Sequence, residues 1–268
     1  MLDPRLDAAQ SLSQRYTLEA QAYAALWAPV LEPLIRTHLD ALDAPPVQRA
    51  LDLATGAGNA LADLRQRFPS ATVIGADRAA GMLRVAPQAN PLVCMDASQL
   101  ALVARAFDFI LMAFALFHLS DPGVGLSEIH RVLRPGGMLA LTTWAGDAES
   151  VATHIWNAAL DAHGATPSEE LEHPAQHELM DSTEKVEALL EAAGFVDVKA
   201  TRREFRHPMK AGEFLQLKSQ LGRNRRRLES LEPKAWKECM TQAQQRFASL
   251  ARDDFTLQLP VVLASGRA

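Results

Sequence analysis

Cysteine is scarce in this chain, with two residues in 268. Cys94 is expected in a buried strand and Cys239 in a late helix, and this spacing offers neither a disulfide framework nor a zinc site. Long apolar runs are missing as well, because the longest, residues 107–119, is too short to cross a bilayer. The first residues lack the positive end and apolar core of a signal peptide. We therefore expect a reduced, cytoplasmic protein without a membrane span.

A basic excess is also missing. The 27 Lys and Arg residues are outnumbered by 32 Asp and Glu residues, which gives a net charge of −5 and a pI near 5.9. A general nucleic-acid binder needs a basic footprint, so the composition argues against nucleic acid as a partner. The length and the 48% hydrophobic content suit one α/β domain with an inserted or appended piece, as a monomer or homodimer.

A glycine pair marks the stretch that organises the chain. The apolar run at residues 50–54 stops at Gly56 and Gly58, and an alanine- and leucine-rich helical pattern follows. This order predicts a strand, a tight turn and a helix start. Glycines allow positive φ and leave the backbone open to close approach by a flat ligand, so the turn is a candidate cofactor loop.

The loop lacks the marks of the common phosphate-binding motifs. Leu61 stands where the NAD fingerprint needs a third small residue, and no lysine precedes Lys185 to complete a P-loop. Asp52 places a carboxylate at the turn, where it would repel a pyrophosphate but could hold an ammonium group. The pattern therefore favours a cationic ligand.

The spacing Asp52-x-Ala54-x-Gly56-x-Gly58 resembles motif I of the class I S-adenosylmethionine (SAM) methyltransferases. Ala54 replaces the usual first glycine, as in the similar quinone C-methyltransferases of the ubiquinone and menaquinone type. Residues 128–137, ending in Arg-Pro-Gly-Gly, also resemble the family's helix, stop and strand order. The resemblance implies a Rossmann-like doubly wound α/β fold of seven strands with an antiparallel last strand, SAM as cofactor and S-adenosylhomocysteine (SAH) as product.

Strand and helix patterns alternate across residues 49–144, which predicts a parallel sheet with its ligand at the carboxyl ends of the strands. The expected organisation is an N-terminal helical lid at 1–46, a SAM-binding core at 47–145, a cap insertion at 146–181, a core helix and sixth strand at 182–206, a second helical cap at 207–252, and a final strand at 253–268.

Asp77 closes the second predicted strand, where a carboxylate can accept hydrogen bonds from ribose hydroxyls. An N-cap for the next short helix is its compatible alternative role. The resemblance implies further cofactor contacts: Ala54, Thr55, Gly56, Gly58 and Ala113 for the methionine end, Arg78 beside Asp77, and Met82, Asp96 and Ala97 for the adenine. Tyr23 is expected as a lid over the methionine part, or else as an aromatic partner of Trp27 that covers the sheet.

The expected reaction is methyl transfer to a small, partly apolar molecule, with an oxygen or carbon acceptor favoured. An oxygen acceptor needs a base, for which His118 and His154 are the candidates, with packing or hydrogen bonding as the alternative for each. Phe117 stands where the family usually has a histidine. His173 and His177 lie four residues apart but lack a third ligand, so no metal is expected.

Two alternatives stay open. An RNA or protein methyltransferase could use the arginines near the end of the chain, although a solvated helix face paired with the acids of residues 169–191 is the plainer interpretation. These are Arg202, Arg203, Arg206, Arg223, Arg225, Arg226 and Arg227. A SAM-binding protein without catalytic activity would keep the glycines and Asp77 but lack a closed acceptor pocket.

Overall fold

The computed structural model describes residues 4–167 and 176–268. Seven strands form one sheet in the order β3-β2-β1-β4-β5-β7-β6. The strands are β1 Arg49–Leu53, β2 Thr72–Asp77, β3 Leu92–Cys94, β4 Phe107–Ala113, β5 Leu133–Trp144, β6 Val196–His207 and β7 Leu257–Arg267. Strands β1 to β5 pair in parallel, whereas β7 runs antiparallel to both β5 and β6. The expected fold class is confirmed.

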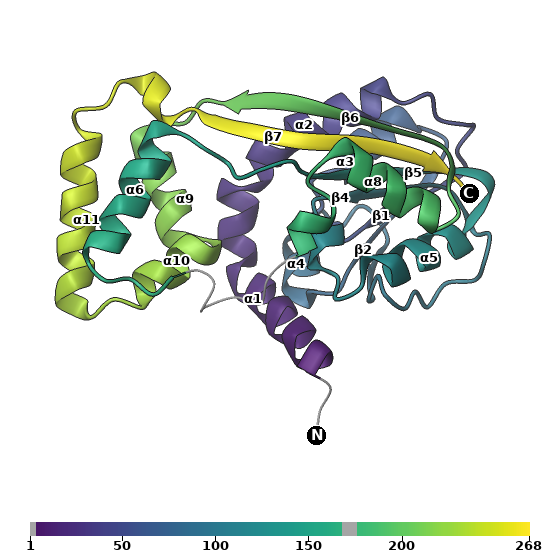
Figure 1. The fold of residues 1–268 in the computed structure, drawn as a ribbon. Helices are drawn as coiled ribbons and strands as arrows, with labels where there is room; N and C mark the ends of the chain where they lie inside the picture. The colour runs from purple at the N-terminus through teal and green to yellow at the C-terminus, as the bar shows by residue number, and fades with distance from the viewer. Residues whose placement is uncertain (1–3, 168–175) are drawn as a thin grey trace.

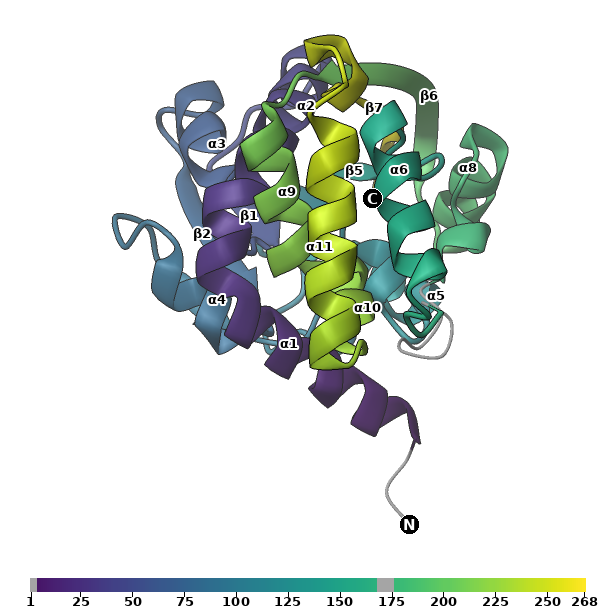
Figure 2. The same cartoon turned by 90° about the vertical axis from the view of Figure 1, so that its left-hand side faces the viewer.

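Helices cover both faces of the sheet. The longer helices are α1 Pro4–Leu26, α2 Ala28–Ala41, α3 Leu61–Arg67, α4 Ala80–Val85, α5 Pro122–Val132, α6 Val151–Ala162, α8 Thr183–Ala192, α9 Ala211–Gln220, α10 Gly222–Glu229 and α11 Pro233–Phe247. Short 3₁₀ turns are η1 Leu116–His118, η2 Gln176–Leu179 and η3 Arg252–Phe255. In Figure 2, α2 and α3 lie on one side of the sheet and α5 and α8 on the other. No helix in the described part of the chain is both long and apolar enough to cross a membrane.

The centre of the sheet is apolar on both faces. All residues of β4 before Ala113 are buried, as expected for a strand between two helical layers. Asp108 is the charged residue of this otherwise apolar strand. Its carboxylate accepts from the backbone N–H groups of Gln48 and Arg49 and pairs with Arg134 at 2.6 Å. These bonds satisfy the charge at the end of the sheet away from the glycine loop.

A second layer of helices stands beyond the carboxyl ends of the parallel strands. It consists of α6, α9, α10 and α11, and the long β6–β7 ribbon reaches from the sheet to it (Figure 1). Helix α1 runs between this layer and the sheet and packs against both α4 and α9 (Figure 1). We call α6, α9, α10 and α11 the helical cap; α1 and the cap together cover the edge of the sheet where the parallel strands end.

Three local expectations were wrong. Strand β6 continues to His207, so Arg202, Arg203 and Arg206 lie on an edge strand with mostly outward-facing side chains rather than in a helical tail. Cys94 is exposed, because β3 is a short strand at the opposite edge of the sheet. The final strand, expected from residue 253, begins at Leu257, because η3 occupies Arg252–Phe255.

Candidate functional site

The loop after β1 is held in a left-handed backbone conformation at three positions. Ala54, Gly56 and Gly58 have φ values of 59°, 57° and 80°. Such angles are ordinary for glycine and unfavourable for alanine, so Ala54 stores strain at the carboxyl end of β1. Phe114, at the carboxyl end of the neighbouring strand β4, has a φ of 55° as well. Backbone strain at two adjacent strand ends is typical of functional sites.

Asp77 links the end of β2 to this loop. Its carboxylate accepts from the N–H of Gly56 at 2.8 Å and from the N–H of Ala79 at 2.7 Å. Burial raises the pKa of Asp77, and the backbone N–H groups of Ala79, Gly56 and Arg78 oppose that rise. Each oxygen keeps a further lone pair, so the carboxylate can still accept from two hydroxyl groups. Asp77 is not the N-cap of α4, because that position is Ala79 and no side chain caps it; the carboxylate accepts from the N–H of Ala79 itself.

Asp52 lies beneath the loop and is 2% exposed. Its carboxyl accepts from Thr55 Oγ1 at 2.5 Å. Burial raises the pKa of Asp52 to about 7, with the Thr55 hydrogen bond opposing and the charge of Asp77 adding to the rise. A cation placed near this carboxyl would favour its ionised form, so the site is electrostatically suited to a positively charged ligand.

Two tyrosines of α1 cover the glycine loop. A Cβ at Gly56 would lie 3.7 Å from the Tyr23 ring, and the rings of Tyr16 and Tyr23 are 6.1 Å apart, edge to face. Burial raises the pKa of both phenols, that of Tyr16 to about 12, so both stay neutral. Tyr23 was the expected lid. Tyr16 was missed, because only its packing position in a helical pattern is visible in the sequence.

Tyr16 also reaches one of the candidate bases. Its hydroxyl lies 2.8 Å from Nε2 of His118, which is half-buried in η1. Burial lowers the pKa of His118 to about 3, with the charges of His177 and Arg15 acting in the same direction, so its imidazole is neutral. His154, the other candidate, is exposed on α6 and pairs with Glu149 at 3.1 Å. The structure therefore brings His118, but not His154, to the glycine-loop side of the site.

The expected adenine contacts lie beside the loop. Met82 is 2% exposed and packs with Ala57, Ala79 and the two tyrosines. Asp96 pairs with Arg78 at 3.3 Å and accepts from the N–H of Ser98 at 2.8 Å. Ala97 is buried next to Asp96. All of these residues follow the carboxyl ends of β2 and β3, as the sequence predicts.

An aromatic cluster borders the site at the ends of β4 and β5. The ring of Phe114, which follows Ala113, lies 4.3 Å from that of Trp144, and Trp27 lies 6.0 Å from Trp144 on its other side. We call Trp27, Phe114 and Trp144 the aromatic floor. Sequence reasoning missed it, since Trp27 was considered only as a partner of Tyr23 and Phe114 only as part of a buried strand.

The arginines of α10 are engaged within the molecule. Arg223 pairs with Asp147 at 2.9 Å, Arg225 with Glu229 at 2.8 Å, and Arg227 with Asp161. Arg226 lies 3.8 Å from Glu19. These partners lie in α1, α6, α10 and the loop after β5, and not in the acidic segment 169–191 from which partners were expected.

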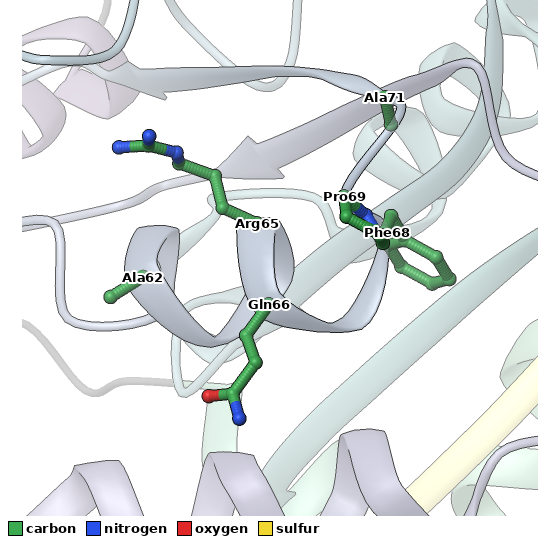
Figure 3. Close-up of a pocket in the computed structure, with 6 residues that line it drawn as sticks. All are labelled: Ala62, Arg65, Gln66, Phe68, Pro69 and Ala71. Atoms are coloured by element: carbon green, nitrogen blue, oxygen red, sulfur yellow. The ribbon is translucent and has the colours of Figure 1, made fainter.

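In the described part of the chain, His177 and the pocket on α3 lie apart from the glycine loop. His177 stacks on Phe117 with 4.0 Å between ring centres, and His173 lies outside the described residues. Within the described ranges no three His, Cys, Asp or Glu residues are grouped as metal ligands. A pocket of about 480 Å³ lies against the outer side of α3 (Figure 3) and contains none of the expected cofactor residues. Its lining residues are Ala62, Arg65, Gln66, Phe68, Pro69 and Ala71.

The sheet order, the antiparallel β7, the glycine loop after β1 and the carboxylate at the end of β2 together define a class I methyltransferase fold. Residues 51–141 match the family described as "Methyltransferase domain". Over residues 51–141 the chain is therefore similar to methyltransferase domains. SAM is the cofactor that the resemblance to the class I enzymes implies for such a domain.

The chain is similar to two curated enzymes over this region. It is 37% identical over 113 residues to the demethylmenaquinone methyltransferase of Beutenbergia cavernae, a match that covers 41% of this chain and 46% of that one. It is 37% identical over 125 residues to the malonyl-[acyl-carrier protein] O-methyltransferase of Laribacter hongkongensis, covering 41% and 42%. The chain thus spans less than half the length of the curated relatives that it matches.

Solved structures extend the similarity of fold to most of the chain. A putative methyltransferase from Bacillus halodurans aligns with a TM-score of 0.52 and 19% identity, over 87% of this chain and 97% of that one. At this identity the likeness concerns the fold alone. The cap and α1 therefore have to be interpreted from their own residues.

Proposed function

We propose that this protein transfers a methyl group from SAM to a small, partly apolar acceptor at oxygen or carbon. The observation that carries the proposal is the direct bond from the Gly56 N–H to Asp77 at the carboxyl edge of the sheet. It joins the glycine loop to a buried carboxylate in the arrangement that a nucleoside with an attached cation requires. The family match over residues 51–141 supports the same function.

The residues around the loop fit the proposed cofactor. Asp77 would hold the ribose hydroxyls, Asp96, Ala97 and Met82 the adenine, and the backbone at Thr55, Gly56, Gly58 and Ala113 the methionine end, with Ala54 and Arg78 shaping the loop edges. Asp52 would supply negative charge below the cationic part of the cofactor, since a bound cation favours the ionised carboxyl. Tyr23 would close over it. When bound, SAM supplies an electrophilic methyl group on a sulfonium centre.

The chain's contribution to the reaction is to orient the acceptor and to exclude water. The aromatic floor and the cap helices would hold an apolar acceptor facing the strand ends. For a hydroxyl acceptor we propose His118 as the base, because its Nε2 lies on the glycine-loop side of the site, 2.8 Å from the Tyr16 hydroxyl. Burial lowers its pKa to about 3, so it would take the proton as the acceptor oxygen becomes cationic on methylation. Tyr16 occupies that nitrogen in the structure, so the acceptor hydroxyl would have to replace the Tyr16 hydroxyl there.

A transfer assay with methyl-labelled SAM tests this function. Phenols, quinols and short apolar carboxylic acids would be offered to the parent protein and to His118→Gln, with His154→Gln as the matched control. We expect labelled product with at least one acceptor, and a loss of roughly 10²-fold or more for an oxygen acceptor in His118→Gln alone. SAH binding without transfer to any acceptor would instead support a non-catalytic SAM-binding protein.

A further inference from the structure

Helix α1 contacts the cofactor side of the molecule at several points. Ser13 Oγ donates to the carbonyl of Arg78 at 3.1 Å, and Thr17 Oγ1 accepts from the N–H of Gly81 at 3.2 Å. Tyr23, further along the helix, lies over the glycine loop. The elements that would hold the cofactor, which are the glycine loop and α4, are therefore in direct contact with α1.

Glu19 joins the same helix to the cap. Its carboxylate accepts from the N–H of Gly222, the first residue of α10, at 3.1 Å, and lies 3.8 Å from Arg226 and 4.0 Å from Arg225. The Glu19 side chain is only 12% exposed. Leu221, the N-cap residue of α10, supplies no side-chain hydrogen bond. Glu19 thus provides, from another helix, the acceptor and the negative charge that stabilise a helix start.

Helix α10 is also bonded to the acceptor side of the molecule. Arg223 pairs at 2.9 Å with Asp147, which lies in the loop after Trp144, a member of the aromatic floor. Arg227 pairs with Asp161 of α6. A shift of α10 would therefore reach both the end of β5 and the rest of the cap.

The contacts of Glu19 differ from the neighbouring ion pairs in what they join. Arg225 and Glu229 pair within α10, and Arg227 and Asp161 pair within the cap. Glu19 instead connects the helix that covers the cofactor loop with a helix of the cap (Figure 1). Because α1 is one continuous helix of 23 residues, a shift of its cofactor-facing residues also shifts Glu19.

We propose that α1 is a strap that couples cofactor occupancy to the position of the helical cap, with Glu19 as its attachment to α10. The inference rests on the proposed methyltransferase function and deepens it, because it concerns how the same site closes. A cofactor bound under Tyr23 would hold α1 in place, and Glu19 would in turn hold the start of α10. Glu19 acts through α10 and is therefore a positioning residue.

Hydrogen exchange with and without saturating SAH tests this coupling and needs no acceptor. Glu19→Gln keeps an oxygen for the Gly222 N–H but loses the charge, whereas Glu19→Ala loses both. Glu229→Gln is the matched control, since it breaks the ion pair with Arg225 inside α10 and leaves the link to α1 in place. Exchange is followed in residues 10–26 of α1 and in residues 222–229 of α10, and SAH affinity is measured by calorimetry.

In the parent and in Glu229→Gln we expect SAH to slow exchange by about threefold or more in both segments. In Glu19→Ala the slowing of residues 222–229 should disappear, and in Glu19→Gln it should fall by about half or more. Both variants should keep the slowing of residues 10–26 and an SAH affinity within about threefold of the parent's.

The exchange of Glu19→Gln without SAH separates coupling from simple fraying of α10. Because its amide oxygen can still cap the helix, residues 222–229 should exchange within about threefold of the parent's rate when SAH is absent. No response of residues 222–229 to SAH in the parent, or an equal response in all four proteins, would refute the coupling while leaving the proposed function intact. Failure of the parent to bind SAH would instead refute the function on which the inference rests.

Discussion

Gly56 and Gly58 share a positive φ but differ in what lies over them. A Cβ at Gly58 would lie 2.7 Å from Pro87 Cδ and 3.1 Å from Ala86 Cβ, so this glycine is required for packing within the domain. A Cβ at Gly56 would meet only the Tyr23 ring, at 3.7 Å or more, on the side where the cofactor is proposed. Gly58 is therefore needed for packing within the domain, whereas Gly56 leaves space for the proposed ligand.

Alanine substitutions should separate these two roles. Gly58→Ala should lower the free energy of unfolding by roughly 2–4 kcal/mol through strain and overlap. Gly56→Ala should cost about 1 kcal/mol and weaken SAH binding by about tenfold or more, because its methyl group enters the space between backbone and ligand. Denaturant unfolding and SAH titration measure both quantities; a larger loss of stability in Gly56→Ala than in Gly58→Ala would contradict this account.

Asp52 predicts a pH dependence of stability. Its folded pKa of about 7 lies above the ordinary 3.8, so the protonated carboxyl stabilises the folded protein at low pH. That contribution is fully present below the ordinary pKa and is lost as the pH rises through about 7. At about pH 8, Asp52→Asn should therefore have a free energy of unfolding roughly 1–3 kcal/mol above that of the parent, and it should unfold at a higher temperature. Near pH 4 the two proteins should be equally stable.

The measurement is a pair of thermal unfolding series across this pH range. Asp63→Asn, whose carboxylate pairs with Arg36 on the surface of α3, is the control and should show no such crossing. Equal pH profiles for Asp52→Asn and the parent would refute the buried, protonated carboxyl.

At the scale of elements, α1 is held over the cofactor loop by a close approach to α4. Gly81 lies against α1, since a Cβ there would stand 2.5 Å from the Cα of Thr17, and its N–H donates to Thr17 Oγ1 at 3.2 Å. This contact places Tyr16 and Tyr23, seven residues apart on one helix, above Gly56 and beside His118. The proposed lid is thus positioned by a glycine of α4.

Gly81→Ala should lift α1 from the sheet without unfolding the core. Because the new methyl would collide with backbone rather than with a movable side chain, we expect faster hydrogen exchange in residues 10–26 and SAH binding weakened by about tenfold. Gly212→Ala, in α9 with open space around it, is the control and should be neutral or stabilising. Unchanged exchange in α1 of Gly81→Ala would show that this contact does not hold the lid.

The sequence predicted those site residues whose position follows from a local strand or turn pattern. Gly56, Asp77 and Asp96 follow apolar strands at regular spacing, and parallel strands bring their ends together, so their proximity followed from the fold class. The pair of Tyr16 and His118 did not, because 102 residues separate them and their contact depends on where α1 crosses the sheet.

At the scale of the whole molecule, we assign cofactor binding to the sheet and acceptor binding to the cap and α1. The sheet presents the glycine loop and its carboxylates at one edge, and the cap with α1 covers that edge (Figure 1). The family match covers residues 51–141, which include the glycine loop and Asp77 but neither α1 nor the cap. Acceptor choice should therefore depend on α1 and the cap, and cofactor binding on the sheet.

The central claim is that SAM binds at the loop joined to Asp77. Calorimetric titration of SAH into the parent, Asp77→Asn and Gly56→Val tests it most directly, with Gly136→Val as the control, since Gly136 has a similar φ of 78° and open space around it. The account predicts micromolar-range binding to the parent and to Gly136→Val, and a loss of about 10²-fold or more in both loop variants. No SAH binding to the folded parent, or equal affinity in all four proteins, would contradict it.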